Sequence, residues 1–186
     1  MSKTFDHSHR SMLDGDERRH ILDPKKVLKQ FPVKGKAADL GCGTGYFTIP
    51  LAVLYEVKVY AIDLQIEMLK DLRKRINNNE KVHLIRSEVT SIPLRSSSLS
   101  LVLSVNVFHE IDNIPGFVDE LYRVLEDRGS AVVIDWNKRD AEIGPPITHR
   151  VEESSCIESM KRMFEHERSL DVGEYNYGHI FLKNNP

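Results

Sequence analysis

The fold of this chain is decided by the stretch Ala37-Ala38-Asp39-Leu40-Gly41-Cys42-Gly43-Thr44-Gly45. A short apolar run ends in an acid, and three glycines follow at alternating positions. Glycine has no Cβ, so the backbone can turn sharply at these positions and approach a ligand closely. The stretch therefore predicts a strand, a ligand-binding turn after it and a nucleotide-like cofactor.

The spacing of the glycines separates two kinds of cofactor turn. The dinucleotide fingerprint needs glycine or alanine three residues after its second glycine, and Tyr46 stands there. No Gly-Lys-Ser/Thr sequence exists for a phosphate loop. Asp39, two residues before the first glycine, is badly placed for a pyrophosphate and well placed for a cation. The turn therefore favours a ligand that carries an ammonium group.

A second acid follows the next predicted strand. The apolar run from Val57 to Ile62 ends in Asp63, about twenty residues beyond the glycine turn, as in a β-α-β unit. A carboxylate at this place can accept both hydrogens of a ribose diol. The alternative is that Asp63 is only the N-cap of the helix that follows.

Alternating elements predict one α/β fold, a doubly wound and mostly parallel Rossmann-like sheet. Further segments around Gly173 predict an antiparallel hairpin at the end. The predicted strands cover residues 36–40, 57–62, 82–86, 99–105, 131–134, 167–172 and 177–182. Apolar spacing predicts a helix that begins near Asn113 and ends at Arg128-Gly129, and a last helix that carries Phe164.

Length and composition narrow the class of protein. A chain of 186 residues suits one domain, 1–186, with residues 1–22 as an arm able to cover the site. A net charge of -2 and a pI near 6.4 argue against a general nucleic-acid binder. No apolar run approaches the roughly 20 residues of a membrane span, so a cytoplasmic protein is expected. The oligomeric state stays open.

The chain gives no sign of a metal or disulfide site. Cys42 and Cys156 are far apart in sequence and form no C-x-x-C pair. Asp6, His7 and His9 could share a metal only if they were held rigidly, and nothing near them in sequence supplies rigidity. We therefore expect no metal.

The residues from Asp39 to Gly45 resemble the first motif of class I S-adenosylmethionine-dependent methyltransferases. From about Lys25 onward the order of elements resembles the seven-stranded fold of that family. Segments 132–136, 144–146 and 173–175 are most similar to small methyltransferases of the ubiquinone/menaquinone-biosynthesis type. Family members often have aspartate where this chain has Ser100.

The resemblance implies S-adenosylmethionine as the cofactor and names the residues that bind it. The glycine turn and Asp39 would hold the methionine end, Asp63 the ribose, and Glu88 with Val89 the adenine. Aspartate is the more familiar residue at the place of Glu88, which could instead be an exposed turn residue. The full expected set is Asp39, Gly41, Cys42, Gly43, Asp63, Leu64, Glu88, Val89 and Val105.

The methyl acceptor is expected at the same edge of the sheet. Asn106, His109 and Trp136 follow the fourth and fifth strands and are candidates to face it, with a loop from Asp140 to Arg150 as a cover. His109 could instead pack or cap a helix, and Trp136 could pack under a loop. We expect methyl transfer to a small-molecule or lipid-like acceptor. The alternatives are a non-catalytic S-adenosylmethionine-binding module and a nicotinamide-dependent oxidoreductase.

Overall fold

The computed structural model describes residues 20–140 and 143–184. Residues 1–19 of the expected arm, 1–22, lie outside the described part of the chain. Asp6, His7 and His9 are among them. The described elements are α2 (Pro24–Leu28), β1 (Ala37–Leu40), α3 (Thr48–Tyr55), β2 (Val59–Asp63), α4 (Ile66–Arg75), β3 (Val82–Arg86), β4 (Leu99–Val105), the 3₁₀ helix η2 (Phe108–Glu110), α5 (Ile114–Val124), β5 (Leu125–Trp136), the 3₁₀ helix η3 (Ile147–His149), α6 (Glu153–Met160), β6 (Phe164–Ser169) and β7 (Asn176–Lys183).

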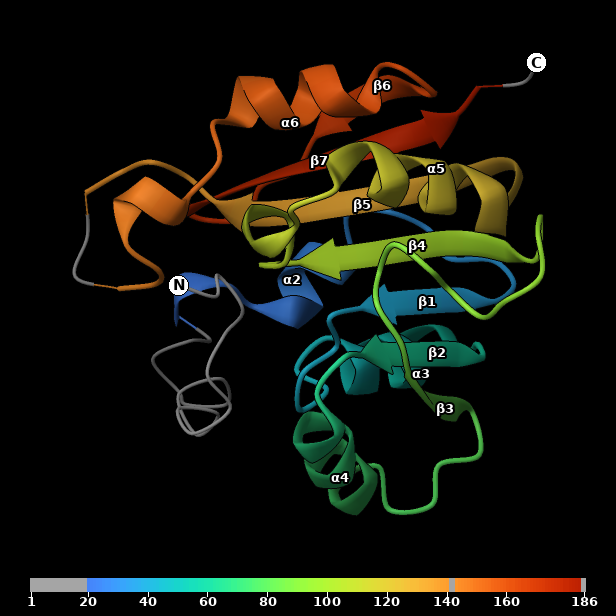
Figure 1. The fold of residues 1–186 in the computed structure, drawn as a ribbon. Coiled ribbons are helices and arrows are strands. Elements are labelled where there is room, and N and C mark those ends of the chain that lie inside the picture. Colours follow the sequence, from blue (N-terminus) through green and yellow to red (C-terminus); the bar gives the residue numbers. More distant parts are fainter. Residues whose placement is uncertain (1–19, 141–142, 185–186) are drawn as a thin grey trace.

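One seven-stranded sheet runs through the molecule in the order β3-β2-β1-β4-β5-β7-β6. Strands β1 to β5 pair in parallel, whereas β7 runs antiparallel to both β5 and β6. The predicted fold class is therefore confirmed, including the C-terminal hairpin. In Figure 1 the arrows of β1, β2 and β4 point to the same edge of the sheet.

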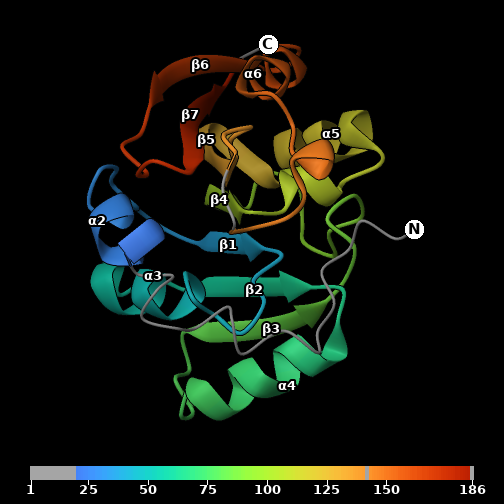
Figure 2. The ribbon, with the colours of Figure 1, turned by 90° about the vertical axis from the view of Figure 1, so that its left-hand side faces the viewer.

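Helices cover both faces of the sheet. Figure 2 shows α2 and α3 on one side and α5 and α6 on the other. Strand β4 supplies both apolar cores, because Leu101 and Leu103 pack with the first pair of helices and Val102 packs with the second. A strand buried on both faces reads as a continuous apolar run, which explains why β4 has the bounds predicted for it.

Two predicted helices extend too far along the chain, and the strands predicted at 131–134 and 167–172 are Leu125–Trp136 and Phe164–Ser169 in the structure. The helix α5 ends at Val124, and β5 begins at Leu125, which pairs with Leu99 of β4. The helix was expected to continue to Arg128-Gly129, because an apolar residue after Val124 fits either a last helical turn or a first strand residue. Likewise α6 ends at Met160, and Phe164 is a buried residue of β6. In the described ranges no helix is long and apolar enough to cross a membrane.

Candidate functional site

The glycine turn joins the carboxyl end of β1 to α3 with all three glycines at positive φ. The φ angles are 65° at Gly41, 52° at Gly43 and 90° at Gly45, which side chains with a Cβ rarely adopt. A Cβ at Gly41 would lie 2.2 Å from Val107 Cγ2, and one at Gly45 would lie 2.3 Å from Leu72 Cδ1. The turn therefore needs glycine both for its conformation and for close packing.

Asp63 is tied to this turn by a backbone hydrogen bond. The N–H of Gly43 donates to Asp63 Oδ2 at 2.9 Å, and the N–H of Gln65 donates to Asp63 Oδ1 at 2.8 Å. Gln65, not Asp63, is the N-cap residue of α4, so the alternative that Asp63 caps this helix is wrong. Burial raises the pKa of the Asp63 carboxyl, while the N–H groups of Gln65 and Gly43 act in the opposite direction.

A second carboxylate lies below the turn. Asp39 is 2% exposed, and its Oδ2 accepts a hydrogen bond of 2.5 Å from Thr48 Oγ1. Burial raises the pKa of the nearby Cys42 thiol, and the charges of Asp39 and Asp63 raise it further. Two acids therefore act on the same short turn, and their negative potential favours a cationic ligand.

The remaining predicted cofactor residues follow the carboxyl ends of the neighbouring strands. Leu64 comes directly after β2 and is 46% exposed. Val105 ends β4 and is buried, and Val89 is half-buried and packs on the core. Glu88 is exposed in the turn after β3, and no hydrogen bond within the described ranges joins its side chain to the glycine turn. The structure thus links Asp63 to the turn directly and leaves Glu88 apart from it.

Among the residues expected to face a methyl acceptor, His109 pairs with an acid that the sequence analysis did not single out. His109 Nδ1 lies 2.7 Å from Asp135 Oδ1, and the backbone N–H of His109 donates to Asp135 Oδ2 at 2.8 Å. Asp135 is fully buried and follows an apolar strand run, as Asp63 does. That position was the available signal for it. Asn106 accepts a hydrogen bond of 2.9 Å from Asn176 Nδ2 of β7.

Trp136 packs against the segment that follows β5. A Cβ at Gly144 would lie 2.9 Å from its ring, and the guanidinium carbon of Arg150 lies 5.5 Å from the ring centroid. Arg150 is buried and donates to four backbone carbonyls of this segment, those of Asn137, Arg139, Ile143 and Pro145. Trp136 therefore has the loop contact that was one of its two predicted roles, and Arg150 is a residue that sequence reasoning missed.

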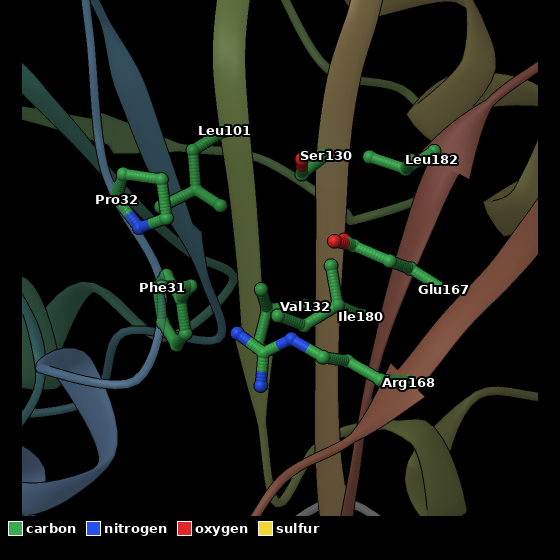
Figure 3. A pocket seen from close by; sticks show the side chains of 9 residues that line it. All are labelled: Phe31, Pro32, Leu101, Ser130, Val132, Glu167, Arg168, Ile180 and Leu182. Carbon is green, nitrogen blue, oxygen red and sulfur yellow. The ribbon is translucent and has the colours of Figure 1, made fainter.

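A separate pocket of about 170 Å³ lies away from these residues, on the face that α2 covers. Figure 3 shows mainly apolar side chains around it, together with Glu167 and Arg168 of β6. It is lined by Phe31, Pro32, Leu101, Ser130, Val132, Glu167, Arg168, Ile180 and Leu182. Leu101 and Ser130 are paired far from the carboxyl end of β4, so the pocket is not part of the candidate site.

Comparison with known proteins gives consistent matches. Residues 38–133 match the family described as methyltransferase domain. An uncharacterized methyltransferase-like protein of Schizosaccharomyces pombe is 36% identical over 102 residues, which are 55% of this chain and 38% of the relative. The demethylmenaquinone methyltransferase of Staphylococcus aureus is 31% identical over 127 residues, which are 64% of this chain and 52% of the relative.

The structural comparison extends over almost the whole chain. The crystal structure of an S-adenosylmethionine-dependent methyltransferase from Aquifex aeolicus gives a TM-score of 0.90 at 30% identity. The match covers 97% of this chain and 100% of that one. By contrast, the chain spans about a third to about half of the length of the curated relatives that it matches.

Proposed function

Because the chain belongs to the methyltransferase domain family, we propose that it transfers a methyl group from S-adenosylmethionine to a small-molecule or lipid-like acceptor. S-adenosylmethionine is the cofactor of this kind of protein. The observation that carries the proposal is the hydrogen bond of 2.9 Å between the N–H of Gly43 and Asp63 Oδ2. It joins the ligand-binding turn to the acid that would bind the ribose.

The residues at the turn fit this cofactor chemically. Gly41 and Gly43 are half-buried, so their backbone remains partly open at the carboxyl edge of the sheet. Each Asp63 oxygen accepts one backbone N–H and has a further lone pair that a ribose hydroxyl can use. Asp39 would act on the ammonium group through its negative charge, because its own side chain is almost completely buried.

The other cofactor residues are assigned by their places after the strands. Leu64 and Val105 would contact the nucleoside from the ends of β2 and β4. Glu88 and Val89 would contact the adenine from the turn after β3. Cys42 would contribute its backbone, since burial raises the pKa of its thiol and keeps that group protonated.

The bound cofactor supplies a methyl group on a sulfonium, which is already activated for displacement. The protein therefore has to align the acceptor with that methyl group and exclude water. Alignment alone can lower the barrier by about 7 to 11 kcal/mol. We assign Asn106, His109 and Trp136 to the acceptor side, because they follow β4 or end β5. Trp136 also packs beside the segment held by Arg150.

The two alternative functions can be separated from this one. A nicotinamide dinucleotide turn needs glycine or alanine at the position of Tyr46. The ring of Tyr46 is buried and its hydroxyl donates to the carbonyl of Leu22, so a core side chain fills this position. A non-catalytic module would keep every cofactor residue. Calorimetry with S-adenosylhomocysteine and with NADH should show binding of the first only. Methyl transfer from labelled S-adenosylmethionine to an acceptor panel should then exclude the non-catalytic module.

The wider setting of the reaction is also a proposal. We keep the expectation of one methyltransferase domain over residues 1–186, in the cytoplasm, with an acceptor other than nucleic acid. Mass spectrometry of the small molecules that copurify with the protein would identify the acceptor class. Retention of NADH in place of S-adenosylmethionine or S-adenosylhomocysteine would refute the proposed function.

A further inference from the structure

His109 is held in one orientation by a carboxylate that is completely buried. Asp135 is 0% exposed and receives three N–H groups: His109 Nδ1 and the backbone N–H groups of His109 and Trp136, at 2.7, 2.8 and 2.7 Å. A carboxylate can only accept these bonds, so Nδ1 carries the hydrogen in the neutral ring. The lone pair of the neutral imidazole is therefore on Nε2.

The imidazole belongs to the segment that packs on the predicted methyl-donor turn. It belongs to η2, which directly follows the carboxyl end of β4. Within the same segment, Val107 is packed so closely on the glycine turn that a Cβ at Gly41 would meet it at 2.2 Å. His109 follows this contact by two residues, so it belongs to the part of the chain that adjoins the predicted donor turn. Figure 1 shows β4 and β5, which position the two members of the pair, side by side.

Three charged groups from three parts of the chain act on the ring. Burial lowers the pKa of His109, but the hydrogen bond and charge of Asp135 from β5 and the charge of Glu110 from η2 raise it. The charge of Arg150, before α6, lowers it, and the net direction is upward. Glu110 Oε1 lies 3.8 Å from Nε2. The two carboxylates would stabilise the imidazolium that forms when the ring takes up a proton.

We propose that His109, positioned by Asp135, is the general base that removes the proton of a phenolic hydroxyl acceptor. This inference rests on the proposed function. The acceptor O–H bond breaks and its proton moves to Nε2, while the oxygen forms a bond to the methyl carbon. The carbon–sulfur bond breaks with its electron pair on sulfur, which leaves S-adenosylhomocysteine, the methyl ether and a protonated His109.

The need for a base selects the acceptor class. A phenolic hydroxyl with a pKa near 10, as in tyrosine, is neutral at pH 7 and becomes a strong nucleophile only as its proton leaves. A carboxylate is already ionised and would gain nothing from His109. The buried cation of Arg150 lies close enough to act on the pKa of the ring, and it would favour an acceptor oxygen that gains negative charge over an ammonium acceptor.

The test uses the full chain with four acceptor panels: phenols, primary amines, thiols and carboxylic acids. We expect transfer to phenols, with the methyl group on oxygen by mass spectrometry. The variant His109→Gln should lower kcat with a phenol by about 100-fold or more at neutral pH. The loss should shrink as the pH rises toward the pKa of the phenol, and imidazole should partly restore His109→Ala. His83→Gln, a half-buried histidine of β3, is the matched control and should keep the wild-type rate.

A second measurement tests the hydrogen bond between His109 and Asp135 without using catalysis. In ¹⁵N-histidine spectra the wild-type His109 should carry its hydrogen on Nδ1. In Asp135→Asn the side-chain amide can donate to Nδ1, which moves the hydrogen to Nε2 and removes the base. Asp135→Asn should therefore lose activity at neutral pH while its calorimetric affinity for S-adenosylhomocysteine stays within about twofold of the wild type.

Each outcome separates this inference from the function on which it rests. No binding of S-adenosylhomocysteine by the wild type overturns the proposed function. Binding without transfer to any phenol, or transfer to amines, thiols, carboxylates or a ring carbon, overturns the hydroxyl acceptor alone. A His109→Gln variant with the wild-type pH profile on a phenol overturns the base, and an unchanged tautomer in Asp135→Asn overturns the positioning role.

Discussion

Replacing Asp63 by alanine removes a carboxylate that serves the turn and the expected ligand together. In the free protein its two oxygens accept the N–H groups of Gly43 and Gln65 at 2.9 and 2.8 Å. In the complex the same oxygens would also accept the two ribose hydroxyls. Asp63→Ala should therefore weaken ligand binding more than it destabilises the fold.

The size of each effect follows from the number and kind of hydrogen bonds. Loss of the bonds between a charged carboxylate and the ribose should cost about 1 to 3 kcal/mol of binding free energy. At 1.4 kcal/mol for each factor of ten, the dissociation constant should rise about 5- to 150-fold. The folded variant also lacks two hydrogen bonds from backbone N–H groups. It no longer buries the carboxylate, however, and burial raises the pKa of that carboxyl in the wild type. We expect a loss of about 1 to 2 kcal/mol in the free energy of unfolding.

Isothermal titration calorimetry with S-adenosylhomocysteine measures the first quantity, and urea unfolding measures the second. Asp119→Ala on α5 is the matched control, because this exposed aspartate pairs with Arg162 and lies outside the turn. Its affinity should equal that of the wild type. If Asp63→Ala fails to fold, Asp63→Asn keeps one acceptor oxygen, removes the charge and should still bind about tenfold more weakly.

One result would refute the ribose assignment. A folded Asp63→Ala protein with the dissociation constant of the wild type would show that the carboxylate supports only the turn. The hydrogen bond to Gly43 would then explain its position completely. Equal losses in Asp63→Ala and Asp119→Ala would point to general destabilisation in place of a lost contact.

Three further predictions concern pH, the turn and the loop. The ribose hydroxyls would donate to ionised Asp63, so the affinity for S-adenosylhomocysteine should fall as the pH is lowered through the raised pKa of this group. Calorimetry of Asp63→Ala should show a flatter pH dependence of the affinity, and an equally steep one would contradict this. Gly45→Ala should lower the free energy of unfolding, measured in urea, by about 2 to 5 kcal/mol, because φ is 90° and the new Cβ would lie 2.3 Å from Leu72 Cδ1. A urea midpoint equal to that of the wild type would be evidence against this packing. Arg150→Lys should lower the free energy of unfolding by about 2 to 4 kcal/mol, because lysine cannot donate to all four carbonyls that Arg150 binds. The control Arg162→Lys on the surface should lower it by less than about 1 kcal/mol. Equal losses in the two variants would exclude a special role for Arg150.

Local pattern was a reliable guide where turn residues flank a predicted strand. Strands β3 and β4 have their predicted bounds, Val82–Arg86 and Leu99–Val105, because turn residues flank each apolar run. The pattern failed after Val124, where one more apolar residue fits a helix and a strand equally well. There the pairing of Leu125 with Leu99 decides the boundary, and that contact joins residues far apart in the chain.

The sequence by itself determined the turn and its partner, since glycine adopts the three positive φ angles most readily and a β-α-β unit places Asp63 beside them. Only the tertiary structure decided how His109 is paired. Its acid, Asp135, is 26 residues away on β5, and the pairing of β4 with β5 brings η2 close enough for a contact of 2.7 Å. Such a contact depends on how two elements pack, and no residue spacing encodes that directly.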